Sequence, residues 1–205
     1  MKKISEKKQA FTEQLIRDSV YEAVLQVLSE HALEKLTVQR VAAAANIGIG
    51  TLYNYFKDKD ALLVYAGIRL FDQLRQRQSE AVGTVSTPLD KLQALVDATF
   101  MFFNKNVAYF QFLEQAQVYH KIARADKHDH IDQEIRMLAG IINQGIKNGD
   151  FKAVNAEKAA NFFHRAIVGT LRVNPELDLF DPHKEAVSLA KMFEIFLAET
   201  PYEKE

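Results

Sequence analysis

The sequence contains no cysteine, and it has only eight glycines and four prolines in 205 residues. The absence of cysteine excludes disulfides, thiolate metal sites and cysteine nucleophiles. It also suits a reducing cytosol, so we expect a cytoplasmic protein. No proline precedes Pro88, and residues that favour helices, such as Ala, Leu, Lys, Glu and Gln, are plentiful. These features together predict an all-α fold.

A membrane-spanning helix needs an apolar run of about 18 to 20 residues, and no run in this sequence approaches that length. The N-terminus begins basic, but no apolar stretch follows it, so it does not resemble a signal peptide. The formal net charge of −1 gives no general indication of a nucleic-acid partner. Four lysines near the N-terminus, offset there only by Glu6, could reach phosphates, or they could form a solvated tail. These are Lys2, Lys3, Lys7 and Lys8.

Residues 37–59, TVQRVAAAANIGIGTLYNYFKDK, predict two short helices joined by a tight turn. Thr37 is a suitable N-cap for a helix at about 38–45. Asn46 tolerates the left-handed conformation that such a turn requires, and a second short helix follows at about 48–54. A longer helix, from about Glu6 to Glu30, precedes the pair. This is the helix-turn-helix arrangement, whose second helix enters the DNA major groove.

The run IGIGTLYNYFKDKDALL resembles the signature of the TetR family of bacterial transcriptional regulators. The resemblance covers roughly residues 15–65, and it implies a helix-turn-helix DNA-binding domain at 1–58. It further implies a ligand-binding and dimerisation domain at 59–205, with about nine helices in the whole chain. The matching positions are Thr37, Val41, Ala42, Ala45, Ile47, Gly50, Thr51, Leu52, Tyr53, Tyr55, Phe56, Lys59 and Leu62.

Within this stretch, Ile47, Leu52 and Phe56 are expected in the core. The predicted DNA-contacting residues are Thr37, Gln39, Arg40, Gly48, Ile49, Gly50, Thr51, Tyr53, Asn54, Tyr55 and Lys59. Hydroxyls and the lysine would bind phosphates, and bare glycine backbone would approach the DNA closely. Tyr55 fits a core position as well as a contact.

Few of these side chains can read bases. Asn54 can bind an adenine edge, Ile49 can contact a thymine methyl group, and Gln39 is the third candidate. The family often has Gly-Val-Ser before the recognition helix, whereas this chain has Asn46-Ile47-Gly48 and so lacks a capping hydroxyl. We therefore expect readout that depends on DNA shape and methyl contacts.

Further helices are expected at 59–81, 88–104, 107–124, 131–147, 155–172 and 183–199, with a polar junction at 126–132. Aromatic residues are concentrated on three of them, and they could line a pocket for a small apolar or aromatic effector or fill an ordinary core. The predicted pocket residues are Phe100, Phe103, Asn104, Phe110, Phe112, Gln115, Tyr119, Gln144, Phe163 and His164.

The last two predicted helices carry more apolar surface than one intramolecular face needs. Pairing them with a symmetry mate would bury that surface in a two-fold homodimer, which implies a roughly palindromic operator in double-stranded DNA. The predicted interface residues are Phe162, Ala166, Thr170, Ala186, Leu189, Ala190, Phe193, Phe196 and Leu197.

No convergent acid–base or nucleophile set is evident, so we expect neither an enzyme nor a cofactor. His128 and His130 are two residues apart and face different ways on a helix, which argues against a metal site. The expected function is a ligand-responsive transcriptional repressor that a small apolar or aromatic effector releases from its operator. The alternative is a helix-turn-helix regulator controlled by a protein partner, which a body cavity too small for a ligand would favour.

Overall fold

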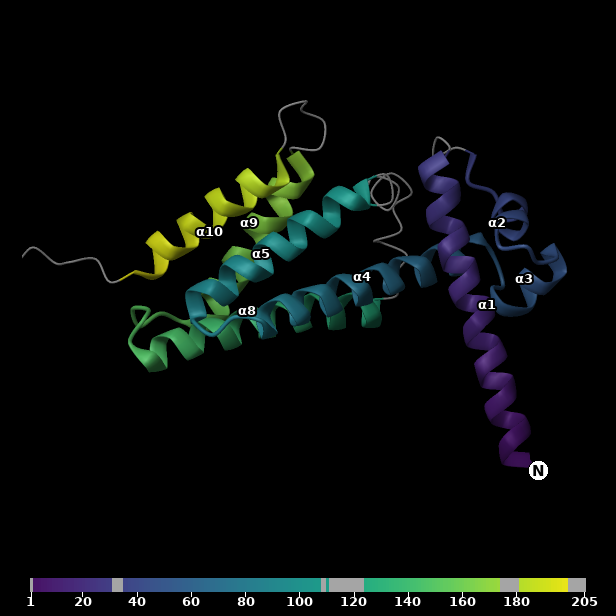
Figure 1. Cartoon of the computed structure of the whole chain (residues 1–205), viewed down its shortest axis with the longest axis horizontal. Coiled ribbons are helices and arrows are strands. Elements are labelled where there is room, and N and C mark those ends of the chain that lie inside the picture. Colours follow the sequence, from purple (N-terminus) through teal and green to yellow (C-terminus); the bar gives the residue numbers. More distant parts are fainter. Residues whose placement is uncertain (1, 31–34, 108–109, 111–123, 174–180, 199–205) are drawn as a thin grey trace, which may run out of the picture. The chain divides into compact units, whose positions relative to one another are not determined.

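The computed structural model describes residues 2–30, 35–107, 110, 124–173 and 181–198, and these residues form eight helices and no strand (Figure 1). The all-α class predicted from the sequence is confirmed. None of the described helices is long and apolar enough to cross a membrane. Most of the helix expected at 107–124 lies outside the described residues.

The chain divides into two compact units. Unit 1 comprises the described residues up to Leu70 together with Phe110 and Arg124, and unit 2 comprises those from Phe71 to Val107 and from Ala125 onward. In unit 1, α1 (Lys2–Glu30) packs against α2 (Val38–Ala44), which leads into α3 (Ile49–Tyr55). Helix α4 (Lys59–Gly83) begins in unit 1 and continues into unit 2.

The core of unit 1 follows the helical periodicity of the sequence. Helix α1 buries one face, and α2, α3 and α4 supply the residues that meet it. The buried apolar residues include Val20, Tyr21, Ala23, Val24, Val27 and Leu28 of α1 and Leu36, Val38, Val41, Ala42, Ala45, Leu52, Phe56, Leu62, Leu63, Ala66 and Leu70 of the following segments. Leu52 and Phe56 are in the core as predicted, whereas Ile47 is only half-buried.

Unit 2 contains the rest of α4 together with α5 (Pro88–Lys105), α8 (Arg124–Asn148), α9 (Ala156–Val173) and α10 (Pro182–Leu197). Helices α5, α8, α9 and α10 bury a shared apolar core around Leu95, Phe100, Ile142, Phe163 and Phe193. The aromatic rings of Phe163 and Phe193 stack with centroids 3.8 Å apart, which joins α9 to α10.

The polar junction predicted at 126–132 is wrong, because the backbone is helical from Arg124 onward. The run DKHDHID contains neither glycine nor proline, so nothing in it prevents the helix from continuing. The predicted end of this helix is confirmed. Gly149 takes the left-handed conformation at φ 80°, where the missing Cβ removes the steric penalty.

A buried polar pair connects α4 to α5 within unit 2. Gln78 is 2% exposed, and its side-chain amide donates a hydrogen bond of 2.9 Å to the Thr99 hydroxyl. That hydroxyl in turn donates to the Leu95 carbonyl at 2.7 Å. Because buried polar groups are costly unless paired, this chain of bonds favours one register between the two helices.

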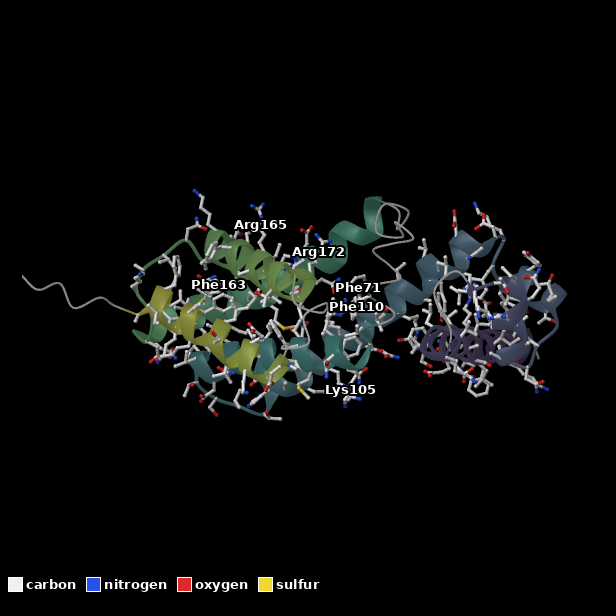
Figure 2. All side chains as sticks on the ribbon, turned by 90° about the horizontal axis from the view of Figure 1, so that it is seen from above. Phe71, Lys105, Phe110, Phe163, Arg165 and Arg172 are labelled. Atoms are coloured by element: carbon white, nitrogen blue, oxygen red, sulfur yellow. The ribbon has the colours of Figure 1, made fainter. Side chains whose placement is uncertain are left out.

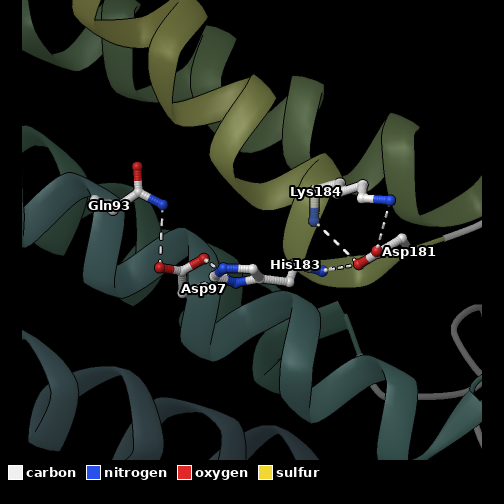
Figure 3. A network of polar contacts seen from close by, with 5 residues as sticks. All are labelled: Gln93, Asp97, Asp181, His183 and Lys184. Atoms are coloured by element: carbon white, nitrogen blue, oxygen red, sulfur yellow. Dashed lines mark hydrogen bonds and ion pairs between the residues drawn. The ribbon is translucent and has the colours of Figure 1, made fainter.

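The start of α10 is fixed by its cap and by a contact with α5 (Figure 3). The Asp181 carboxylate accepts hydrogen bonds from the backbone N–H groups of His183 and Lys184. The bond from the Lys184 backbone is the main cause that lowers the pKa of Asp181 below its usual value. His183 lies 3.8 Å from Asp97 of α5, and Gln93 donates to the other oxygen of that carboxylate.

Gly145 of α8 lies against the ring of Phe151, and a Cβ at this position would overlap the ring. Phe151 belongs to the core of unit 2 and is 6% exposed, and its backbone N–H bonds the Gly145 carbonyl at 3.2 Å. The turn after α8 therefore depends on a glycine at 145. At Gly140, on the same helix, an added Cβ would meet nothing within 4 Å.

This contrast gives a stability prediction. Gly145→Ala should lower the free energy of unfolding by about 1–3 kcal/mol, because the Phe151 ring must move to admit the methyl group. Gly140→Ala should raise it by about 0.5–1 kcal/mol, because alanine is the better helix former. Urea denaturation of both variants checks the pair. Equal changes in the two would show that the Phe151 contact does not constrain position 145.

Candidate nucleic-acid interface

The turn between α2 and α3 has the geometry that the sequence predicted. Asn46 takes the left-handed conformation at φ 54°, and it is the one non-glycine residue with positive φ in the described part of the chain. The N–H of Ile47 bonds the Ala42 carbonyl at 3.0 Å, which closes the turn. Ser19 of α1 donates to the Ala45 carbonyl at 3.3 Å, so α1 also holds the end of α2.

Two capping side chains fix the ends of the neighbouring helices. The Thr37 hydroxyl accepts a hydrogen bond from the Arg40 N–H at 3.3 Å and so caps α2. The Asp58 carboxylate accepts from the Ala61 N–H at 2.7 Å and caps α4. Each cap satisfies an N–H that would otherwise lack a partner at the start of its helix.

Helix α3 is exposed on the side opposite its buried Leu52. Ile49 is 43% exposed and Tyr53 is 47% exposed, so both present apolar surface to solvent. Of the predicted contact residues, the exposed ones are Gln39, Arg40, Gly48, Ile49, Gly50, Tyr53, Asn54 and Lys59, and the half-buried ones are Thr37, Thr51 and Tyr55. The fold thus places these residues at the surface of one small unit.

The two glycines at the start of α3 are not required by internal packing. A Cβ at Gly50 would meet nothing within 4 Å, and one at Gly48 would meet only the Thr51 hydroxyl at 3.7 Å. Neither has positive φ, so neither is needed for backbone conformation. The absent side chains leave room for a partner that approaches the backbone from outside.

Lys59 has a structural bond in addition to its predicted role. Its ammonium donates to the Leu36 carbonyl at 2.7 Å and so ties the start of α4 to the segment before α2. An ammonium has three donors, so two remain for a phosphate. Lys57, whose side chain is 85% exposed, was not among the predicted contacts. The sequence does place Lys57 directly after Phe56, at the end of α3, and that position could have marked it as a candidate contact.

Arg17 joins α1 to the segment that follows α3. Its guanidinium lies 5.1 Å from the ring centroid of Phe56 and 5.4 Å from that of Tyr65, and it pairs with Glu13 at 3.0 Å. Farther along α1, Asp18 pairs with Arg69 of α4 at 2.8 Å. These contacts hold α1, α3 and α4 as one rigid frame beneath the exposed face.

The predicted pocket residues of unit 2 do not gather around one described cavity. Phe100 and Phe163 are fully buried in the core, and Phe103 packs against that core. Asn104 is exposed, and the exposed Gln144 accepts a hydrogen bond from Lys91 at 2.9 Å. His164 lies 3.3 Å from Glu134. Phe112, Gln115 and Tyr119 lie outside the described residues, and Phe110 belongs to unit 1, where it is 2% exposed.

Unit 2 has a surface hollow of a different character. It is lined by Asp72, Arg75, Gln76, Ser79, Glu80 and Met137. Five of these six side chains are polar, and Arg75 already bonds Asp72 and Gln133. Such a lining does not suit an apolar effector.

Seven of the nine predicted interface residues separate into two groups, and the other two, Ala166 and Thr170, are half-buried. Ala186, Leu189, Ala190, Phe193 and Leu197 are buried in the core of unit 2, because α10 packs on α5 and α9 through that face. Phe162 is 56% exposed and Phe196 is 41% exposed, and their rings stack with centroids 5.8 Å apart. Figure 2 shows the same division on α9, where Phe163 is directed into the unit and Arg165 points away from it.

The family model for bacterial regulatory proteins of the tetR family matches residues 20–66, the span from the packed part of α1 to the first turns of α4. The transcriptional repressor KstR2 of Mycobacterium tuberculosis is 27% identical over 141 residues, which cover 66% of this chain and 69% of that protein. Over residues 20–66 the chain is similar to the TetR family of transcriptional regulators. Its matched relatives are DNA-binding transcriptional regulators, and α3 has the position of the recognition helix in a helix-turn-helix.

Two further similarities come from Bacillus subtilis. The fatty acid metabolism regulator protein of strain 168 is 25% identical over 135 residues, which cover 65% of this chain and 69% of that protein. The crystal structure of the regulator FadR in complex with stearoyl-CoA has the same fold. It aligns with a TM-score of 0.67 at 18% identity, over 88% of this chain and 98% of FadR.

The open space at Gly50 predicts a separation of stability from DNA binding. Gly50→Ala should leave the melting temperature unchanged or higher, because alanine favours the helix and the methyl group meets no protein atom. It should weaken operator binding about tenfold or more, equivalent to about 1.4 kcal/mol, because the methyl group occupies the space left for DNA.

Gly83→Ala is the matched control, because a Cβ there also meets nothing within 4 Å, at the far end of α4. Fluorescence anisotropy with labelled operator and thermal denaturation measure both variants. Unchanged affinity in Gly50→Ala would mean that the backbone of α3 does not approach DNA closely.

Proposed function

We propose that this protein is a ligand-responsive transcriptional repressor that binds a palindromic operator as a homodimer and is released by a small apolar effector. The observation that supports the proposal is the exposed face of α3. Its exposed side chains and the open space at its glycines lie on a helix that is anchored in the core through the buried Leu52. A helix presented in this way fits the major groove. Two such heads related by a two-fold axis require half-sites about 34–36 Å apart.

The homodimer is supported by apolar surface that unit 2 leaves exposed on α9 and α10. Met192 is 61% exposed and Ile195 is 66% exposed, and by helical spacing they lie on the same side of α10 as Phe196, whose ring stacks on that of Phe162. Contiguous apolar surface of this kind marks an interface. The residues of α10 that face the chain's own core cannot contribute to it, so the proposed interface uses the exposed residues of the two helices.

An apolar effector is supported by two of the relatives. One is named for fatty acid metabolism, and a solved regulator of this fold holds stearoyl-CoA. In this chain the apolar interior of unit 2 includes the aromatic residues Phe100 and Phe163, with Phe103 at its edge. Asn104 and Gln144 are exposed, so we leave these two predicted pocket residues out of the proposed effector site. The site that we propose lies beside the α5 and α9 aromatic residues.

The effector would act by favouring a conformation whose two heads no longer match the half-sites. Moving the operator-competent population from 99% to 1% requires about 5.5 kcal/mol of differential binding. Because coupling is reciprocal, operator DNA should weaken effector binding by the same factor.

The proposal is tested in two steps with the purified full-length protein. Selection from a random DNA pool should yield a palindrome bound in a salt-sensitive manner. Stearoyl-CoA and free stearate are then titrated against the complex, and at least one should release the DNA. Sequence-independent binding that neither of these apolar compounds affects would contradict the proposed function.

The interface is tested separately. Met192→Glu combined with Ile195→Glu should convert the dimer to a monomer with unchanged helicity, because two carboxylates per protomer would be buried without partners. Met101→Glu is the control, since Met101 is also an exposed methionine, at 43%, but on α5. Sedimentation velocity measures the mass. A double variant that remains dimeric would place the interface elsewhere.

A further inference from the structure

The N-terminal part of α1 extends beyond the packed part of unit 1 (Figure 1). Helix α1 is 29 residues long, but its buried residues begin at Val20. From Lys7 to Leu15 the side chains are exposed, apart from the half-buried Glu13. These nine residues form about two and a half helical turns that do not contribute to the core of the DNA-binding head.

This extension is basic. Residues 2–12 contain four lysines and a single acidic residue, Glu6. Lys7 and Lys8 are exposed, and no ion pair is formed by either among the side chains that the structure describes. Glu13, the next acidic residue, is paired with Arg17. The lysines are therefore available to an external anionic partner.

The extension is held in a fixed place relative to the recognition helix. Ser19 of α1 bonds the carbonyl of Ala45, one residue before the turn into α3, and Asp18 pairs with Arg69. Lys8 is eleven residues before Ser19, so the helix carries it about 16 Å from that anchor at 1.5 Å per residue. This attachment means that the basic extension moves with α3 when α3 enters the major groove.

We propose that Lys7 and Lys8 form a second DNA-contact surface, which lies on the phosphates flanking each operator half-site. The surface adds affinity without reading sequence, because phosphates are the same at every base pair. It complements a recognition helix with few base-reading side chains. A helix of about 10–12 Å diameter is too wide for a minor groove of about 6 Å, so α1 lies over the backbone. The inference rests on the proposed function, since it requires operator binding.

Phe11 is 66% exposed and Leu15 is 53% exposed on the same extension. By helical spacing, both fall between Lys7 and Lys8 around the axis, and such a pattern also occurs in helices that lie on anionic membranes. The rigid attachment of α1 to the recognition helix favours DNA over a membrane surface. Vesicle binding therefore serves as a competing outcome in the test.

The test compares Lys7→Gln/Lys8→Gln with a control, Lys105→Gln/Lys147→Gln, which removes two exposed lysines from unit 2. Each protein is titrated with the selected operator at several salt concentrations. In the dimer the first variant should reduce the slope of log affinity against log salt by about 3 to 4, since each lost phosphate contact contributes about 0.9. The control should retain the wild-type slope, and both variants should melt at the wild-type temperature.

A second readout uses two duplexes, one trimmed to the half-sites and one extended by ten base pairs on each side. The wild-type protein should bind the extended duplex more tightly, and Lys7→Gln/Lys8→Gln should bind the two equally. If the wild type binds no operator, the proposed function fails. If it binds but the variant keeps its salt slope and flank preference, only the second contact surface is overturned. The second contact surface would also be overturned if Lys7→Gln/Lys8→Gln lost the binding to phosphatidylglycerol vesicles that the wild type shows, while its DNA binding stayed unchanged.

Discussion

The packing of α1 against α2, α3 and the start of α4 is the constraint on which the DNA-binding head depends. Two seven-residue helices cannot be stable alone, since isolated helices shorter than about 12–15 residues are marginal in water. Helix α1 supplies the apolar face that stabilises them. The Arg17 guanidinium lies close to the rings of both Phe56 and Tyr65, and Ser19 bonds the carbonyl at the end of α2, so contacts from α1 set the direction of α3. The upper face of α3 is then free to carry DNA-binding residues.

Helix α10 in unit 2 is likewise divided into a buried face and an exposed face. Phe193 and Leu197 turn inward, and Ile195 and Phe196 turn outward on the same helix. The inner face stabilises the chain itself, whereas the outer face is exposed. The stacked rings of Phe162 and Phe196 extend this outer surface from α10 onto α9.

Much of the fold was predictable because local signals agreed. The cap at Thr37, the left-handed Asn46 and the terminating Gly149 all act within a few residues, and each starts or ends a helix. The failure at residues 126–132 has the opposite cause. Clustered charge suggests a junction, but a helix tolerates polar residues wherever one side faces solvent.

The sequence alone determined the helical class, the helix-turn-helix and the family resemblance, because these depend on short-range periodicity and on a compact motif around Gly50 to Phe56. Only the tertiary structure decided which apolar residues serve the chain's own core. Periodicity identified the apolar stripe of α10, but it could not divide Phe193 from Phe196, because that division depends on how α5 and α9 pack against the helix. The tertiary structure also shows that Lys59 bonds Leu36 and that residues 7–15 of α1 lie outside the core. Both depend on how distant parts of the chain come into contact, which local sequence signals do not report.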